Sequence, residues 1–273
     1  MQATSLIYPF DVGAFSSDIG DRRFLKSLYA WFRQIWDPLF TATGLLSLPR
    51  YLRDLRRYKR LASGKTQVPI RLAPQLHDRS ATSAVQQHYF FLNGWALRKI
   101  AAAKPPLHVD VGSQVDFANS VAAFVPTVFV DIRPLYDKMS GLLPIAGDLL
   151  RPPLREEAIT SLSCLHVVEH IGLGRYGDEL DPAGTQKAAY QLTQTLAPGG
   201  DLYLGLPIGR PHVYFNAHRV HSAGQVLSFF EDLELCEFDA VDDLGRYIEA
   251  ARPTDFDTSH YACGMFHFRR PRS

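Results

Sequence analysis

One stretch of the sequence decides the fold that we expect: His108-Val109-Asp110-Val111-Gly112-Ser113-Gln114-Val115-Asp116. It opens as a short apolar run that a glycine ends, which is typical of a buried strand. Phe117–Phe124 then has the apolar spacing of a helix, and Thr127–Val130 is a second β-branched run, followed directly by Asp131. A strand, a helix and a second strand in this order predict parallel strands of one sheet.

The alternation of helices and strands continues on both sides of this unit. Asp181-Pro182 has the composition of a helix start, with Asp181 as the N-cap and proline at the first helical position. We expect helices over Ala84–Ala103, Asp181–Leu196 and Ala223–Phe230, and strands over Ile159–Val168, Leu202–Leu206, Leu233–Val241 and Tyr261–Phe268. Residues 84–273 are therefore predicted to form an α/β domain with a mostly parallel sheet. Its ligands are expected outside the carboxyl ends of the strands.

The first 83 residues differ from this domain and are expected to form a basic helical extension and linker. Residues 1–70 hold 11 Lys and Arg against 5 Asp and Glu. The second of its two expected helices, Pro49–Leu61, carries arginines along one side. Such a side suits a solvated or packing face, a membrane surface reached through residues 24–60, or nucleic acid. No recognised nucleic-acid-binding module accompanies it. The expected elements are helices over Phe24–Phe40 and Pro49–Leu61, interrupted at Gly44 and Pro49, and a linker over Gly64–Ser83.

The composition is that of a globular protein. The chain has 273 residues, a net charge of +1, 46% hydrophobic residues and 21% charged residues, which argues against a disordered, collagen-like or coiled-coil protein. No apolar run approaches the roughly 18–20 residues of a spanning helix, and the N-terminus lacks the apolar core of a signal peptide. Cys164, Cys236 and Cys263 cannot all pair, so we expect thiols in a reducing cytoplasm, with the inner face of a membrane as an alternative location.

Several segments resemble, in order and spacing, the motifs of class I S-adenosylmethionine-dependent methyltransferases. His108–Gly112 is similar to their first motif, and Asp131 to the acid that binds the ribose hydroxyls. Gly147-Asp148 is similar to the segment near the adenine amino group, and Leu196–Gly200 to their helix–PGG–strand signature. The resemblance covers residues 85–270 and implies a Rossmann-like sheet with a C-terminal antiparallel hairpin. It also implies S-adenosylmethionine as cofactor, held by Asp110, Gly112, Ser113, Asp131 and Asp148.

Two longer strings resemble a narrower family on this fold, made up of uncharacterised bacterial proteins often linked with surface-polysaccharide synthesis. The strings are Leu165-His166-Val167-Val168-Glu169-His170-Ile171-Gly172-Leu173-Gly174-Arg175-Tyr176-Gly177-Asp178 and Phe215-Asn216-Ala217-His218-Arg219-Val220. The chemistry of that family is inferred from its fold only, and a fold does not fix a function.

The first motif departs from the pattern D-x-G-x-G-x-G of the methyltransferases. Only Gly112 remains, because Gln114 and Asp116 replace the other two glycines. Gln114 adds a side chain where the methionine part of the cofactor needs room, whereas Asp116 could pair with its amino group or sulfonium. An open cleft beside Asp131 would favour a cofactor, and a cleft filled by Gln114 would favour a domain that only binds a partner. As alternatives, the acids at the strand ends cap helices or belong to turns.

A cluster of histidines and charged residues is expected on the acceptor side of the site. Glu169 and His170 end one predicted strand, and His218 and Arg219 follow the next. A histidine or a carboxylate there can act as general base toward a hydroxyl group, and Arg219 can hold a phosphate or carboxylate of the acceptor. The alternative is structural: His170 would then order its loop by bonding the backbone. Other nearby histidines, His166, His212 and His221, are expected to be structural.

The string His166-Val167-Val168-Glu169-His170 also matches the H-x-x-E-H pattern of one group of zinc proteases. That site requires the string to lie inside a helix. Here a segment with strand character precedes it and two glycines follow, so no metal site is predicted.

Three functions remain open. The first is a methyltransferase that acts on a glycan or another small polar acceptor. The second is a degenerate domain that no longer methylates and instead binds a partner or a nucleotide-like ligand. The third is a group-transfer enzyme that uses a nucleotide-sugar in the same cleft.

Overall fold

The computed structural model describes residues 36–62, 70, 72–77, 85–133 and 135–272. The chain separates into two compact units, residues 1–85 and 86–273. Each unit is described by itself.

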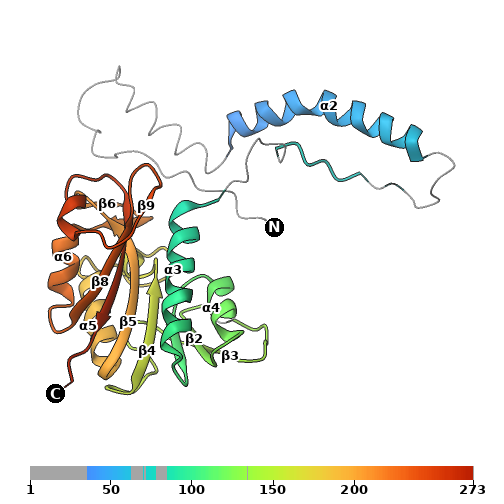
Figure 1. Ribbon diagram of the computed structural model, residues 1–273. Helices are drawn as coiled ribbons and strands as arrows, with labels where there is room; N and C mark the ends of the chain where they lie inside the picture. The colour runs from blue at the N-terminus through green and yellow to red at the C-terminus, as the bar shows by residue number, and fades with distance from the viewer. Residues whose placement is uncertain (1–35, 63–69, 71, 78–84, 134, 273) are drawn as a thin grey trace. The chain divides into compact units, whose positions relative to one another are not determined.

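The first unit contains helix α2, Pro38–Ala62, which is drawn in blue in Figure 1. The predicted break at Gly44 and Pro49 is wrong, because α2 runs through both residues. Proline removes one backbone donor, a loss that an exposed helix can tolerate where water solvates the freed carbonyl. The expected helix over Phe24–Phe40 and the linker over Gly64–Ser83 lie largely outside the described residues. No described helix is long and apolar enough to cross a membrane.

The second unit is built on an eight-stranded sheet with the order β3-β2-β1-β4-β5-β10-β8-β9. The strands from β3 to β5 are parallel, whereas β10, β8 and β9 are antiparallel to their neighbours. The mostly parallel sheet with antiparallel strands at the C-terminus is thus as predicted. The bounds are β1 His108–Val111, β2 Thr127–Asp131, β3 Leu142–Ala146, β4 Ile159–Leu165, β5 Leu196–Ile208, β8 Glu234–Val241, β9 Tyr247–Ile248 and β10 Ala262–Arg269.

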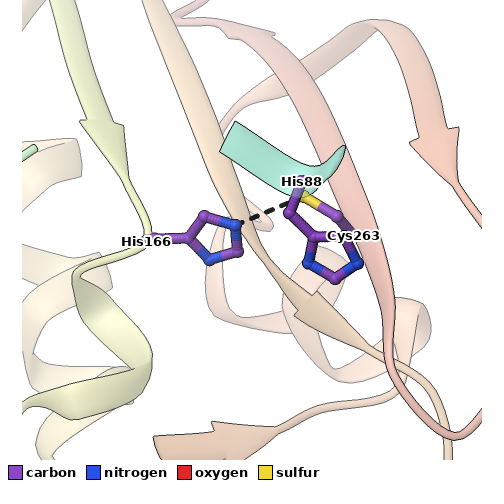
Figure 2. Close-up of side chains that lie close together, drawn as sticks. All are labelled: His88, His166 and Cys263. Atoms are coloured by element: carbon purple, nitrogen blue, oxygen red, sulfur yellow. Dashed lines mark hydrogen bonds between the residues drawn. The ribbon is translucent and has the colours of Figure 1, made fainter. Parts of the chain in front are cut away.

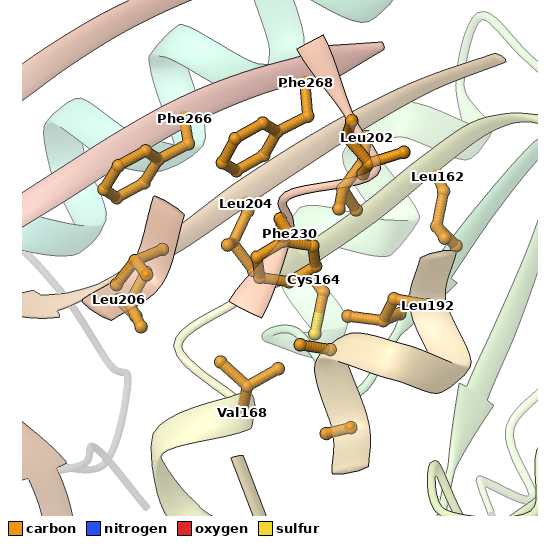
Figure 3. Close-up of a cluster of buried hydrophobic side chains, with 14 of the residues drawn as sticks. Leu162, Cys164, Val168, Leu192, Leu202, Leu204, Leu206, Phe230, Phe266 and Phe268 are labelled. Carbon is orange, nitrogen blue, oxygen red and sulfur yellow. The ribbon is translucent and has the colours of Figure 1, made fainter. Parts of the chain in front are cut away.

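Helices cover both faces of the sheet (Figure 1). On one face, α3 (Gln87–Ala103) and α4 (Val115–Ala122) pack with Tyr203 and Met265. Helix α3 approaches so closely that a Cβ on Gly205 would lie 2.4 Å from a methyl group of Leu92. On the other face, α5 (Gly184–Thr195) and α6 (Ala223–Phe229) cover a larger apolar core, shown in Figure 3.

That larger core is built from alternate residues of the strands. Its members from β5 and β10 include Leu202, Leu204, Phe266 and Phe268, whose neighbours along each strand face α3 instead. The period of two that buried strands require therefore divides the sheet into two apolar surfaces.

Several boundaries differ from the predicted ones. Asp181 is not the N-cap of α5; Ala183 is, and Asp181 instead accepts a hydrogen bond from the backbone N–H of Ala183. Strand β4 ends at Leu165, and the short 3₁₀ helix η1 (Val168–His170) follows. Elements without a counterpart in the predicted list are β3, β9, the hairpin of β6 (His212–Tyr214) and β7 (His218–Val220), and the 3₁₀ helix η2 (Pro253–Phe256).

Candidate functional site

A cavity of about 470 Å³ opens at the carboxyl ends of β1, β2, β3 and β4. This is the edge of the sheet where open α/β folds bind their ligands. Four of the nine predicted site residues line it: Gly112, Asp131, Asp148 and His170. The cavity is also lined by Arg133, Arg151, His166, Val167, Tyr176, Gly177, Asp178 and Lys187.

The turn after β1 leaves this cavity open. Gly112 has φ +68°, a left-handed conformation that glycine adopts without a steric penalty. A Cβ there would lie 3.0 Å from Cγ1 of Val167 across the cavity wall. Gln114 does not fill the space, because its side-chain oxygen accepts a hydrogen bond of 3.1 Å from Asn93 of α3. The first-motif departure at Gln114 therefore leaves the cleft beside Asp131 unobstructed.

Asp110 and Ser113 lie behind the cavity wall in a buried polar network. The carboxylate of Asp110 accepts hydrogen bonds from the backbone N–H of Ser113 at 3.1 Å, from its hydroxyl at 2.7 Å, and from the hydroxyl of Ser163. The same Ser163 contacts Nε2 of His108 at 2.8 Å, and Nδ1 of His108 lies 2.8 Å from the hydroxyl of Ser161. These bonds hold the turn after β1 against β4.

The hydrogen bonds of this network run in one direction. When Asp110 is ionised, Ser163 donates to its carboxylate and therefore accepts from Nε2–H of His108, whose Nδ1 then accepts from Ser161. Burial lowers the pKa of His108 to about 3, so the ring is neutral. Burial raises the pKa of Asp110 to about 7, against the opposing effect of its hydroxyl donors. Asp110 is fully buried, so its contacts with the cavity are indirect.

Asp131 ends β2 at the cavity, as predicted from its position, and it is paired with Arg133. One carboxylate oxygen accepts from the backbone N–H of Arg133 at 2.7 Å and from its Nε at 3.2 Å, and the other accepts from a terminal nitrogen at 3.3 Å. The guanidinium of Arg133 lies 4.6 Å from the ring centre of Tyr176. Sequence reasoning missed Arg133 and Tyr176, although a cation two residues after a strand-end acid was a visible signal.

Asp148 lies on the cavity wall after β3, where Oδ1 accepts a hydrogen bond of 2.9 Å from the backbone N–H of Leu150. The opposite rim is the glycine-rich loop after η1. Asp178 orders that loop by accepting backbone hydrogen bonds from Gly172, Gly174 and Tyr176 at 2.7, 3.3 and 3.2 Å. These donors outweigh partial burial and lower the pKa of Asp178.

His170 presents its ring to the cavity from η1. Its Nδ1 lies 2.6 Å from the backbone carbonyl oxygen of Ala217, which can only accept, so Nδ1 carries the proton. The lone pair is therefore on Nε2, which lies 3.9 Å from a carboxylate oxygen of Glu169. Burial, helped by the nearby Arg175, lowers the pKa of His170 below its usual value. At neutral pH this ring can accept a proton from a bound group.

Glu169, His218 and Arg219 are buried beside the cavity and do not line it. Glu169 accepts a hydrogen bond of 2.8 Å from Nδ1 of His166. Arg219 donates to the backbone carbonyls of Ile171 and, at 2.8 Å, of Asp181. These contacts give Arg219 the task of tying the glycine-rich loop to the start of α5.

His166, which was expected to be structural, lies at the cavity. It adopts φ +56°, which is uncommon outside glycine, and its side chain lies at the cavity wall. Burial opposes its charged form, but the Cys263 sulfur and the Glu169 carboxylate prevail and raise the pKa of His166 to about 10. Because His166 directly follows strand β4 and Glu169 lies in a 3₁₀ turn, the H-x-x-E-H string lacks the helix of the zinc proteases.

The comparisons with known proteins give one family and a set of structures. The model of the family described as "Caenorhabditis protein of unknown function, DUF268" matches residues 155–242, about a third of the chain, and this range includes both quoted strings. That description contains nothing about bacterial surface polysaccharides. No curated protein matches.

One match is the crystal structure of the [4+2]-cyclase SpnF, with 14% sequence identity and a TM-score of 0.51. The matched region covers 72% of this chain and 86% of the SpnF chain. The N-methyltransferase NodS from Bradyrhizobium japonicum, solved with S-adenosyl-L-homocysteine, is 16% identical over 66% of this chain and 86% of its own, with a TM-score of 0.45. This second match is too weak to support an argument by itself. The order of the strands in the sheet and the match to SpnF confirm the predicted fold. It is the Rossmann-like fold of class I methyltransferases.

Proposed function

We propose that this protein is a methyltransferase that uses S-adenosylmethionine and acts on a glycan or another small polar molecule. One observation carries the proposal: the cavity beside Asp131 is open, although Gln114 and Asp116 have replaced two glycines of the first motif. The side chain that would have blocked a cofactor is instead bonded to α3.

The placement of polar groups supports a division of the cavity into two sides. Asp131 and Asp148, at the ends of β2 and β3, suit the hydroxyl and amino groups of an adenosine. His170 lines the same space from the η1 side, with Nδ1 bonded to the carbonyl of Ala217. A methyl acceptor hydroxyl must lose a proton as it attacks, and a neutral imidazole can take that proton. S-adenosylmethionine supplies an electrophilic methyl group when it is bound.

The cofactor can be tested by calorimetric titration with S-adenosylmethionine and S-adenosylhomocysteine. Wild-type protein is expected to bind either at micromolar concentration, and Asp131→Asn is expected to bind at least ten-fold more weakly, which is 1.4 kcal/mol or more. Asp201→Asn is the matched control, since this carboxylate lies outside the cavity and bonds His267 and Arg269. Absence of binding up to about millimolar concentration, roughly 4 kcal/mol of affinity, in a folded sample would sink the proposal.

A nucleotide-sugar titration belongs in the same experiment. Binding of UDP- or GDP-sugars without binding of S-adenosylmethionine would favour the group-transfer alternative. The cations Arg133, Arg151 and Lys187 at the cavity are the groups that a diphosphate would contact in that case.

We also propose that α2 contacts an anionic membrane surface. Its exposed apolar side chains include Leu39, Phe40, Leu45 and Leu46, and its C-terminal half is rich in arginine. An exposed apolar surface beside basic residues is typical of helices that lie in a lipid interface. Co-sedimentation with phosphatidylserine vesicles, and none with pure phosphatidylcholine vesicles, is expected. Equal retention of a variant in which Leu45 and Leu46 are both serine would contradict this role.

A further inference from the structure

Three side chains from distant parts of the sequence meet behind the cavity: His88, His166 and Cys263 (Figure 2). They come from α3, from the end of β4 and from β10. One potential ligand atom of each lies within 4.8 Å of the others. Cys263 is fully buried and His166 nearly so, and neither belongs to the proposed methyl-transfer chemistry. We propose that this cluster is a zinc site with two imidazoles and one thiolate as ligands.

The donor set suits zinc. Imidazole and thiolate are the ligands that Zn²⁺ takes in proteins, with bonds of about 2.0–2.1 Å to nitrogen and 2.3 Å to sulfur. In a tetrahedral site these bond lengths separate the ligand atoms by roughly 3.3–3.6 Å. The distance between Nε2 of His166 and Sγ of Cys263 is already 3.6 Å. Only His88 has to approach, by about 1 Å, which a side chain near the start of a helix can do.

Each of the two rings also has one nitrogen held by a hydrogen bond. Nδ1 of His166 lies 2.8 Å from the carboxylate of Glu169 and keeps its proton there, which leaves Nε2, 3.6 Å from the sulfur, as the nitrogen that would bind the metal in place of a proton. The His88 ring is hydrogen-bonded to the backbone of Tyr261, which occupies one of its two nitrogens. A ligating histidine normally donates its second N–H to a carboxylate or a backbone carbonyl, and both forms occur here.

Burial of charge argues for a cation at this place. Glu169 is buried, and its second carboxylate oxygen has no hydrogen-bond partner among the described residues. A thiolate at Cys263 would add a second negative charge to the same interior. A divalent cation balances both negative charges.

The backbone supports the same assignment. Regular alternation along β4 and the left-handed φ of His166 together turn this side chain toward α3 and β10, at a cost of about 1 kcal/mol. Among the described residues no fourth side-chain ligand completes the group. Three protein ligands with one open position are the arrangement of catalytic zinc sites, and structural sites have four.

The test uses the full chain without a histidine tag, because a tag would bind metal. Mass spectrometry of the purified protein for metals is expected to find stoichiometric zinc. After removal of zinc with a chelator, Co²⁺ should restore occupancy and give the near-ultraviolet charge-transfer band that only a thiolate ligand produces.

Cys263→Ser should abolish that band. Cys164→Ser is the matched control, because Cys164 is equally buried in the opposite core and is not part of the cluster. Glu169→Gln should keep the band and weaken zinc binding by roughly 10–100-fold, because the carboxylate that holds Nδ1 of His166 is lost.

Two results would overturn the proposal. One is wild-type protein that takes up neither Zn²⁺ nor Co²⁺ at an excess of metal, a result that does not depend on any variant folding. The other is a Co²⁺ spectrum that is unchanged in a folded Cys263→Ser variant, which would place the metal elsewhere. Neither readout depends on binding of S-adenosylmethionine, so the zinc site and the proposed function can fail independently.

Discussion

Alanine at two glycines that line the cavity and at one in the loop beside it should separate backbone strain from steric overlap. Gly177, Gly112 and Gly172 all have positive φ, of +88°, +68° and +81°. An alanine in this region costs about 1–2 kcal/mol whatever surrounds it. The surroundings differ: a Cβ meets nothing within 4 Å at Gly177, a methyl of Val167 at 3.0 Å at Gly112, and the backbone oxygen of Asp181 at 2.1 Å at Gly172.

The expected order of destabilisation follows from these distances. Gly177→Ala should lower the free energy of unfolding only by the strain of an alanine with positive φ, about 1–2 kcal/mol. Gly112→Ala should cost slightly more, about 2 kcal/mol, because the half-buried Val167 can yield by a few tenths of an ångström. Gly172→Ala should cost about 3–5 kcal/mol, since a backbone carbonyl must move by more than 1 Å to make room.

Urea unfolding followed by circular dichroism measures this series. Val167→Ala in the Gly112→Ala background should recover the crowding part of the cost and leave the backbone part. Gly172→Ala that is no more destabilising than Gly177→Ala would refute the reasoning, because the two sites share their backbone conformation and differ only in the contact.

Three further changes test the groups around the cavity. The pKa of Asp110 is about 7 in the folded protein, whereas the unfolded chain releases the same proton near pH 4. Asp110 therefore adds roughly 4 kcal/mol to the free energy of unfolding at low pH, and this contribution is lost as the pH rises to 7. Asp110→Asn should flatten that part of the curve of unfolding free energy against pH, and parallel curves would contradict the raised pKa. Asp178→Asn should lose at least one of the three backbone bonds, lower stability by about 1 kcal/mol and speed amide exchange at Gly172; unaltered exchange would speak against its role. Arg219→Ala should lower stability by about 1.5–3 kcal/mol in thermal or urea unfolding, because the carbonyl of Ile171 loses a charged donor. A loss under about 0.5 kcal/mol would contradict this structural role and favour the predicted role of Arg219 in binding the methyl acceptor.

The central strands were predictable because each is a short apolar run that a glycine, proline or acid ends. Strand β3 was not, since Leu142–Ala146 is an edge strand with partly exposed side chains and contains Pro144. Proline is tolerated at an edge, where its missing donor would face no partner. The continuous helix α2 was missed because a proline inside a helix usually interrupts it. Here the exposed helix continues through Pro49.

The candidate site was predictable only as far as topology fixes it. Residues at strand ends, such as Gly112 and Asp131, line the cavity because parallel strands bring their carboxyl ends to one edge. The direction of a side chain after the strand has ended is a different matter. Glu169 bonds His166, and Arg219 bonds backbone carbonyls, so neither side chain lines the cavity. No periodicity in the sequence predicts these side-chain directions.

The polar ladder between β1 and β4 has a consequence for how such chains can be recognised. His108 and Asp110 on one strand, and Ser161 and Ser163 on the other, repeat with the period of two that places them on one face. A slip of either strand by one residue would carry its two polar groups into the apolar core on the opposite face. The paired pattern H-x-D and S-x-S thus works as a register key, readable from sequence alone. It could retrieve distant kin in which the glycines of the first motif have been lost.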